Sequence, residues 1–291
     1  MTCRRDFLKQ SALLSAGFMV NKNSFFKSNT VGLQLYTVRS EVSKDKLAGT
    51  IKTIADAGYT HLELFGYNPQ KREFFGHSVK QMADLLKQNN LKSPSGHYGL
   101  ADMMHGENYN WDSWKYLLDD SKTLGHNYVV IPYLDDKHRT ADDYKRLADR
   151  LNKGGEMARK MGMCAGYHNH DFEFNDLGGT NGWEILLNNT EKKYVAMEMD
   201  IYWVVYAKKD PIDYFKKYPG RFQMWHVKDM QTSPKVQSTI VGEGVIDFKK
   251  LYEERKTAGL DQLYVEQEAY NEPVFDCIRK SYTFVKNNIV K

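Results

Sequence analysis

Cysteine is scarce in this 291-residue chain, and its scarcity excludes a fold held together by a disulfide framework. Of the three cysteines, Cys3 lies near the N-terminus, which leaves only Cys164 and Cys277. Cys164 lies inside an apolar run and is expected to be a small core residue. The seven prolines and 21 glycines are gathered in no linker, and the composition does not shift along the chain. We therefore expect a single folded domain.

Signatures of phosphate binding and of membrane spanning are missing as well. No G-x-G-x-x-G follows the first expected strand, and no Walker A segment occurs. The apolar run at residues 11–20 is too short to cross a bilayer. The formal net charge of +4 arises within residues 1–27, where five basic residues face one acidic residue, and the rest of the chain holds 36 of each. A neutral body lacks the electrostatic footprint of a nucleic-acid-binding protein.

The N-terminal segment has the layout of an export signal. Arg4 and Arg5 precede Phe-Leu-Lys and the apolar run at residues 11–20, and a charged start before such a run is typical of exported proteins. The paired arginines resemble the twin-arginine export motif. We predict that residues 1–27 are a leader, that residues 28–291 form the domain, and that the protein is periplasmic without a membrane anchor. The alternative is a cytosolic protein with an amphipathic N-terminal segment.

From residue 31 onwards, eight short apolar runs alternate with segments of helical periodicity. In the first helical segment Leu47, Ile51 and Ile54 recur at the helical period, and Gly58 follows as a C-terminal stop. The expected strands are 31–36, 61–65, 91–97, 127–132, 163–168, 194–200, 222–226 and 263–266. The expected helices are 44–57, 79–88, 111–124, 141–161, 182–188, 211–217, 248–258 and 273–286.

This alternation predicts an α/β protein with a closed (β/α)8 TIM barrel as its single domain. Strands that alternate with helices form right-handed βαβ units and a parallel sheet. Eight such units over roughly 260 residues fit a closed barrel. An open α/β sheet is the alternative architecture, and the missing dinucleotide fingerprint counts against it.

The last four expected strands each end in a side chain that can bind a metal ion. MCAGYH ends in His168, YVAMEMD in Asp200, FQMWH in His226 and LYVE in Glu266. In a parallel barrel these ends lie on one rim. Any one of them has an ordinary explanation, such as a structural hydrogen bond or a helix cap, but four in succession do not. We predict a site for one divalent cation, and its mixed nitrogen and oxygen ligands suit Mn²⁺, Fe²⁺, Co²⁺ or Zn²⁺ better than Mg²⁺.

Two further residues, His170 and Lys228, are expected on the same strand faces as the predicted ligands His168 and His226. His170 follows His168 by two positions, and it either hydrogen-bonds substrate or replaces His168 as the ligand, whereas Asn169 should point away. Lys228 follows His226 by two positions and is aimed at the pocket. Its ammonium could hold a sugar oxygen or stabilise an enolate.

The alternative for Lys228 is a salt bridge with Asp229 or Glu198, and Asp229 could instead hydrogen-bond His226. On the first half of the barrel, Glu63 and His97 lie at or near strand ends, where substrate contact and structural hydrogen bonding are equally plausible.

Aromatic residues accompany the expected site. Trp203 is a candidate for contact with substrate, and with Tyr202, Tyr206 and Trp225 it would suit stacking against a sugar ring. The alternative for each of them is ordinary packing.

The chain resembles the sugar phosphate isomerase/epimerase superfamily of xylose isomerase-like TIM barrels over essentially everything after the leader. The resemblance implies one divalent metal held by a Glu-Asp-His-Glu set, with the two glutamates exchanging a proton next to a carbonyl. Asp200, His226 and Glu266 fill the last three places. The segments that carry the resemblance are 166–170 (GYHNH), 200–203 (DIYW), 220–221 (GR), 226–229 (HVKD) and 264–267 (YVEQ).

The chain departs from that pattern at its first place, where His168 stands instead of glutamate. A metal-bound imidazole is a poor base because its free nitrogen is normally tied to another group. Glu266 is then the only evident carboxylate base among the ligands, unless Glu173 or Glu268 supplies a second. Two-base epimerisation is therefore in doubt, whereas isomerisation or elimination needs less symmetry.

The sequence favours a metal-dependent isomerase or epimerase that acts on a sugar or keto-sugar through an enediolate, with Glu266, Lys228 and His170 as catalytic residues. The alternative is a lyase or hydratase that acts on 3-keto-glycosides at the same site. An apurinic-type endonuclease is disfavoured by the neutral body, and a non-catalytic sugar-binding barrel is disfavoured by the retained ligands. Dimers are common in the resembled superfamily, so a homo-oligomer is possible.

Overall fold

The computed structural model describes residues 30–99, 109 and 111–290. The leader predicted over residues 1–27, with its paired arginines, lies outside the described residues, and so does the start of the predicted domain. Within the described part, no helix is long and apolar enough to span a membrane.

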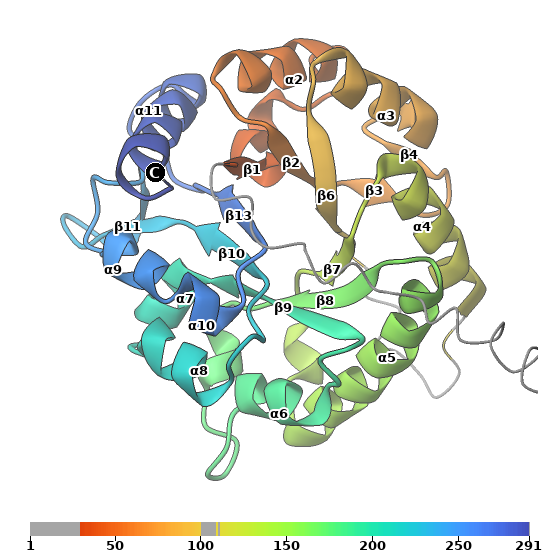
Figure 1. Ribbon diagram of the computed structural model, residues 1–291, viewed down its shortest axis with the longest axis vertical. Coiled ribbons are helices and arrows are strands. Elements are labelled where there is room, and N and C mark those ends of the chain that lie inside the picture. The colour runs from red at the N-terminus through yellow and green to blue at the C-terminus, as the bar shows by residue number, and fades with distance from the viewer. Residues whose placement is uncertain (1–29, 100–108, 110, 291) are drawn as a thin grey trace, which may run out of the picture.

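Eight parallel strands close into a barrel, which confirms the predicted (β/α)8 fold (Figure 1). Around the barrel the hydrogen-bonded order is β1, β13, β10, β9, β8, β7, β6 and β2. Each barrel strand therefore pairs with the barrel strands that precede and follow it in the chain, and the first pairs with the last. The strands are β1 (Gly32–Gln34), β2 (His61–Leu64), β6 (Lys92–His97), β7 (Tyr128–Ile131), β8 (Cys164–His168), β9 (Val195–Asp200), β10 (Met224–Val227) and β13 (Gln262–Val265).

Helices surround the barrel in Figure 1 and cover its outer face. All eight expected helical segments form, although residues 248–258 divide into two short helices instead of one. The α-helices are α2 (Leu47–Asp56), α3 (Val79–Gln88), α4 (Trp111–Leu124), α5 (Ala141–Lys160), α6 (Gly182–Asn189), α7 (Ile201–Tyr206), α8 (Pro211–Lys217), α9 (Phe248–Glu253), α10 (Arg255–Ala258) and α11 (Val274–Asn288). Short 3-10 helices are η1 (Leu35–Glu41), η3 (Asp136–His138) and η4 (Phe172–Phe174).

Local chemistry fixes where several of these elements begin and end. Gly58, which follows α2, has a φ of +103°, a backbone conformation that glycine adopts more readily than other residues. The side chain of Gln34 accepts a hydrogen bond from the N–H of Tyr36, so β1 ends earlier than expected and η1 begins. Thr140 and Asp143 form a reciprocal capping box at the start of α5.

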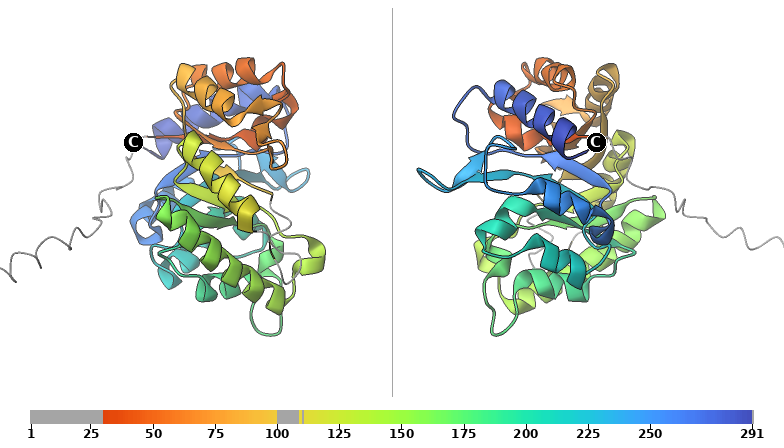
Figure 2. Two further views of the ribbon diagram at one scale, coloured as in Figure 1. Left: turned by 90° about the vertical axis from the view of Figure 1, so that its right-hand side faces the viewer. Right: turned by 60° about the vertical axis from the view of Figure 1, so that its left-hand side comes forward.

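Two small sheets that the sequence did not predict lie between barrel elements. After β2 come three antiparallel strands, β3 (Tyr67–Asn68), β4 (Glu73–Phe74) and β5 (His77–Ser78). After β10 comes the hairpin of β11 (Asp229–Gln231) and β12 (Gln237–Thr239), which projects from the barrel body in Figure 2. Strands of two or three residues are too short to show a periodic pattern, which is why the sequence did not reveal them.

The barrel interior changes character along its length. Val130, Ala196 and Met224 form a small buried apolar cluster inside the barrel. Towards the carboxyl ends of the strands the interior becomes polar, because alternate residues of a strand point inwards. On β9, for example, Ala196 is followed on the same face by Glu198 and Asp200. The site therefore has a polar floor as well as a polar rim.

Candidate metal centre and active site

The structure brings the predicted ligands together at the carboxyl end of the barrel. His168 and Asp200 are the last residues of β8 and β9, His226 lies in β10, and Glu266 directly follows β13. His168 Nε2 lies 3.9 Å from Asp200 Oδ2, and His226 Nδ1 lies 3.0 Å from Glu266 Oε2. One ligand atom each from Asp200, His226 and Glu266 lies within 4.8 Å of the others. We call His168, Asp200, His226 and Glu266 the rim set.

Asp200 serves two purposes at once. Its Oδ1 accepts the backbone N–H groups of Tyr202 and Trp203 and so caps α7. Its Oδ2 faces His168 and Lys228. The helix cap, which was the ordinary explanation for an aspartate at a strand end, therefore coexists with a position in the candidate metal centre.

Lys228 is buried beside the rim set and carries a positive charge there. Its Nζ lies 3.4 Å from Asp200 Oδ2 and 3.5 Å from Glu266 Oε2, and it forms a short ion pair with Glu268. Burial would lower the pKa of Lys228, but these three carboxylates raise it. Lys228 therefore stays protonated, and its partners differ from the two considered from the sequence, Asp229 and Glu198.

Asp229 points away from the site, and the idea that it orients His226 is wrong. Its carboxylate accepts four backbone N–H groups, from Met230, Gly242, Gly244 and Ile246, at 2.8 to 3.2 Å. A carboxylate with so many local donors anchors the segment that follows β12.

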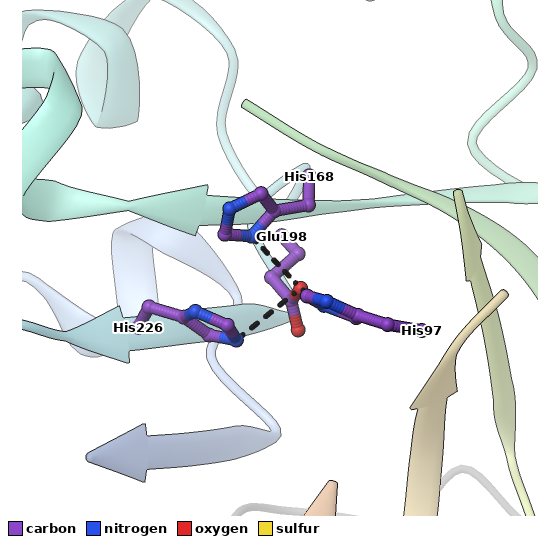
Figure 3. Close-up of side chains that lie close together, drawn as sticks. All are labelled: His97, His168, Glu198 and His226. Carbon is purple, nitrogen blue, oxygen red and sulfur yellow. Dashed lines mark hydrogen bonds and ion pairs between the residues drawn. The ribbon is translucent and has the colours of Figure 1, made fainter. Parts of the chain in front are cut away.

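A second group of side chains lies on the inside of the barrel, where His97 and Glu198 approach the rings of His168 and His226 (Figure 3). We call Glu63, His97 and Glu198 the floor set. His97 Nε2 lies 2.5 Å from Glu198 Oε2 and 3.2 Å from Glu63 Oε2, and Glu63 is further held by Gln34 and Ser95. Glu63 was predicted to bind substrate, and the structure places it fully buried with all these partners. His97, by contrast, lines the main cavity.

His168 and His226 belong to the rim set and also contact the floor set. His168 does so through Nδ1, and His226 does so through Nε2. His168 Nδ1 lies 3.1 Å from Glu198, and His226 Nε2 lies 2.6 Å from Glu63 and 3.3 Å from Glu198. Together with His97 and Glu198, these two histidines form a second group that could hold a cation. Burial and the neighbouring His226 lower the pKa of His168 to about 3, so its ring is neutral and can offer a lone pair.

Burial and charge shift the carboxylate pKa values in opposite directions within the site. Burial raises the pKa of Asp200 to about 7 against the opposing charge of Lys228. Burial would also raise the pKa of Glu266, but Lys228 and His226 hold it well below its usual value. Glu266 therefore stays ionised, as a proton acceptor requires.

His170 lies beside the ligands without joining either group. The centroid of its ring lies 5.0 Å from that of His168, and the ring stacks on Phe172 with a centroid distance of 5.6 Å. Between the two alternatives left open by the sequence, the groups that could hold a cation include His168 and not His170. Asn169 points away as expected, because its side-chain amide exchanges hydrogen bonds with the backbone of Asp200.

The main cavity of about 500 Å³ opens above the rim. His97, His168, His170 and Glu266 reach it from the barrel. The remaining lining is mostly aromatic and glycine-containing, and consists of Tyr36, Phe65, Gly66, Tyr67, Gly99, Pro132, Tyr133 and Glu268. Aromatic walls with a few convergent polar groups are typical of a small-molecule site.

Trp203 lies in a second cavity of about 330 Å³ next to the first. Tyr202, Tyr206 and Lys228 also line it, and Glu268 lines both cavities. Trp225 does not reach either one, because it stacks on Phe215 at 4.8 Å in the layer between barrel and helices. Packing is thus the correct explanation for Trp225, whereas Trp203 and Tyr206 border a cavity.

The two further glutamates considered as a second base differ in position. Glu173 is fully buried, and its carboxylate accepts hydrogen bonds from the Tyr167 hydroxyl at 2.7 Å and the His170 N–H at 2.8 Å. Burial raises the pKa of Glu173 to about 8, but it lines neither cavity. Glu268 lines both cavities and lies beside Lys228.

A closed α/β barrel with clustered imidazoles and carboxylates at its C-terminal rim is the architecture of a barrel enzyme. The chain belongs to the xylose isomerase-like TIM barrel family, whose model matches residues 51–284. A solved sugar phosphate isomerase/epimerase from Parabacteroides distasonis ATCC 8503 is 27% identical, with a TM-score of 0.78 over 92% of this chain and 97% of that chain.

Other relatives carry different names. Inosose dehydratase from Lacticaseibacillus casei is 29% identical over 144 residues, 44% of this chain and 48% of the relative, so the chain spans about half the length of the curated relatives it matches. The solved IOLI protein with a bound zinc atom shares the fold, at 16% identity and a TM-score of 0.68 over 89% of this chain and 98% of that chain.

Proposed function

We propose that the protein is a divalent-metal-dependent lyase that acts on a keto-sugar or keto-polyol. It removes a proton next to the carbonyl and then eliminates water or an alcohol. The observation that carries this proposal is the asymmetry of the rim set, in which an ionised carboxylate, Glu266, faces the cavity and the neutral imidazole of His168 stands where a second carboxylate base would be needed. Elimination uses one base, so it fits this site better than two-base epimerisation.

Three residues of the rim set, Asp200, His226 and Glu266, fit a divalent ion because one ligand atom of each lies within 4.8 Å of the others, and His168 lies next to Asp200. Ligands arranged tetrahedrally at about 2.1 Å from an ion lie about 3.4 Å from one another. The distances of 3.0 Å between His226 and Glu266 and 3.9 Å between His168 and Asp200 bracket that value. A bound ion there supplies Lewis-acid polarisation of the substrate carbonyl.

The protein's own residues would then carry the proton and charge movements. Glu266 takes the proton from the carbon beside the carbonyl, and the electron pair moves onto the carbonyl oxygen as an enolate. The Lys228 ammonium stabilises the negative charge that develops. Collapse of the enolate breaks the bond to the group on the next carbon, which leaves with its electron pair and takes up a proton. His170, whose Nδ1 is buried without a partner, is placed to hydrogen-bond a substrate hydroxyl.

The names of the relatives support an enolate chemistry of this kind. The curated relatives include inosose dehydratases from several bacteria, and the solved neighbours include a protein named 3-keto-D-glucoside 4-epimerase. A dehydratase and an epimerase of keto compounds can both begin with proton removal next to a carbonyl. The isomerase or epimerase predicted from the sequence would therefore share its first step, removal of a proton next to a carbonyl, with the lyase proposed here.

Proton NMR in D₂O tests the proposal. Mn²⁺- or Zn²⁺-loaded protein is incubated with a panel of keto-sugars and keto-inositols. Loss of a hydroxyl with formation of a carbon–carbon double bond or its tautomer supports the lyase. Deuterium exchange with the hydroxyls retained would assign the protein to isomerases or epimerases instead. No reaction with any substrate, in protein shown to contain metal, would contradict the proposal and favour a non-catalytic sugar-binding barrel.

The second cavity favours one particular form of this lyase, in which the leaving group is the aglycone of a 3-keto-glycoside. Glu268 forms part of both cavities, and aromatic side chains of α7 border the second one. A ketone ring above the rim would then place its leaving group towards Trp203 and Tyr206. A p-nitrophenyl 3-keto-glucoside is the direct probe, because its elimination releases coloured p-nitrophenol. Release at a rate no higher than without protein, from a preparation that dehydrates keto-inositols, would restrict the activity to dehydration.

A further inference from the structure

One oxygen of a buried carboxylate is the meeting point of three imidazole rings. Glu198 Oε2 lies 2.5 Å from His97 Nε2, 3.1 Å from His168 Nδ1 and 3.3 Å from His226 Nε2 (Figure 3). Glu198 has no exposed surface, and it lies two residues before Asp200 on the same face of β9. A carboxylate can only accept hydrogen bonds, so each of these three nitrogens is the one that carries the hydrogen.

The positions of these hydrogens determine what the other side of two rings can do. A neutral imidazole has one N–H and one lone pair. When Nδ1 of His168 donates to Glu198, its lone pair is on Nε2, the atom that faces Asp200 at 3.9 Å. In His226 Nε2 donates to the floor, and Nδ1 shares a hydrogen with Glu266 at 3.0 Å; when a cation takes the place of that hydrogen, the lone pair is on Nδ1. Both lone pairs then point into the rim set.

We propose that Glu198 is a positioning residue that fixes the tautomer and the ring orientation of His168 and His226, so that both present a lone pair to a cation held at the rim. Glu198 is not itself a ligand. The inference rests on the proposed metal site and deepens it, because it explains how two imidazoles on different strands come to face one point. At His226 Glu63 is the nearer acceptor, because its Oε2 lies 2.6 Å from Nε2 against 3.3 Å for Glu198 Oε2, so the two carboxylates hold this ring together.

The alternative is that the ion binds among His97, His168, Glu198 and His226. Each imidazole has a single lone pair, so a ring whose lone pair faced the floor would turn an N–H towards Asp200 or Glu266. The floor offers an ion Glu198 Oε2, which is already surrounded by three nitrogens, and Glu198 Oε1, which has no hydrogen-bond partner among the described residues, whereas the rim offers Asp200 and Glu266 from two strands. Both places hold two carboxylates, but Glu266 of the rim lines the main cavity, where an ion keeps a position open to substrate, which favours the rim.

The first test reads the tautomers directly and needs no turnover. Zn²⁺-loaded protein with ¹⁵N-labelled histidine is studied by long-range ¹H–¹⁵N correlation NMR. We expect His168 to carry its hydrogen on Nδ1 with Nε2 bound to zinc, and His226 to carry its hydrogen on Nε2 with Nδ1 bound to zinc. The reverse assignment at either ring would overturn the proposal.

The second test measures metal affinity by competition with a chelator in the variant Glu198→Gln. Groups that orient metal-binding histidines typically contribute about 10- to 100-fold in affinity, and a loss in that range is expected here. Glu173→Gln is the matched control, because Glu173 is another fully buried glutamate whose carboxylate touches neither ring of the rim set. Its Zn²⁺ affinity should stay within about twofold of that of the unmodified protein. Equal affinities of the Glu198→Gln and unmodified proteins would contradict the proposal.

A third variant separates positioning from direct ligation. His97→Asn removes a member of the floor set whose ring packs against the rings of His168 and His226, at centroid distances of 5.0 and 5.3 Å, and whose Nε2 pairs with the floor carboxylates Glu63 and Glu198. The proposal expects Zn²⁺ to bind His97→Asn protein more tightly than Glu198→Gln protein, and the visible spectrum of bound Co²⁺ to remain unchanged in His97→Asn. Loss of Co²⁺ binding in His97→Asn would show that the floor holds the ion. If Glu198→Gln does not fold, the tautomer measurement on the unmodified protein still decides. Because no readout depends on a substrate, a failed lyase assay leaves this test intact.

Discussion

The rim and the floor of the barrel are two groups of buried carboxylates that neutralise their charge in different ways. At the rim, Asp200, Glu266 and Glu268 share the ammonium of Lys228. On the floor, Glu63 and Glu198 are surrounded by imidazole rings and by the side chains of Gln34 and Ser95. His168 and Glu266 of the rim line the main cavity, whereas the floor carboxylates Glu63 and Glu198 are fully buried and only His97 of the floor set reaches that cavity.

This difference shows which part of the site can exchange partners. An ammonium on a long side chain can move from one carboxylate to another group, so the rim can accept a cation or a substrate oxygen without leaving a buried charge unpaired. Imidazoles held from both sides cannot turn without breaking several hydrogen bonds at once. We therefore expect the floor to define the geometry of the site and the rim to bind the cation and the substrate.

The largest effect is expected from Asp200→Asn at the rim. Loss of one ligand charge weakens cation binding, and the several kcal/mol that a metal contributes to the transition state correspond to a loss of about 10³-fold or more in kcat/KM. Steady-state kinetics and metal content measure this. Asp261→Asn is the control, because Asp261 lies at the opposite end of the barrel, bonded to Tyr128, and its replacement should leave kcat/KM unchanged. An Asp200→Asn enzyme with near-normal activity would show that the rim is not the metal site.

A smaller but more informative effect is expected from Lys228→Met. Without the ammonium, kcat should fall about 10²- to 10³-fold, the usual contribution of one group that stabilises an oxyanion. Metal-free protein should lose about 3–5 kcal/mol of unfolding free energy because its buried carboxylates lose their counter-charge, and added Zn²⁺ should restore much of it. Urea unfolding with and without Zn²⁺ measures the difference. Lys235→Met in the second cavity is the control, and equal destabilisation with and without the metal would contradict the exchange of partners described above.

The smallest effect concerns His126, a histidine buried away from both groups. Its Nδ1 donates to the carbonyl of Ser93 at 2.6 Å, and burial lowers its pKa from 6.5 to about 4. Because the unfolded chain binds the proton more readily, this histidine contributes stability that is present above about pH 6.5 and lost as the pH falls towards 4. The change amounts to at most about 3 kcal/mol.

Urea unfolding of the unmodified protein and of His126→Gln between pH 7.5 and pH 4.5 measures this contribution. The difference between the two should shrink as the pH falls, since the glutamine does not titrate. A constant difference would mean that His126 does not titrate as its buried position implies. His226 provides the contrast, because burial lowers its pKa but Glu198 and Glu266 raise it well above the usual value.

Most of the fold and the outer half of the site were predictable from the sequence. The strand ends at His168, Asp200, His226 and Glu266 are local features, visible as apolar runs that stop at a polar residue. Glu198 was missed as part of the site, although a signal for it exists. It interrupts the apolar run of β9 two residues before Asp200, and the strand period of two places both side chains inside the barrel.

The sequence alone determined the barrel and the residues at its rim, because helical and strand periods and the residue at a strand end are properties of short segments. Only the tertiary structure decided what those residues face. His226 contacts Glu63, which lies 163 residues earlier in the chain, and Lys228 pairs with Glu268 rather than with its neighbour Asp229. Such pairs depend on how the barrel closes and on the register of strands distant in sequence, and no local pattern encodes either.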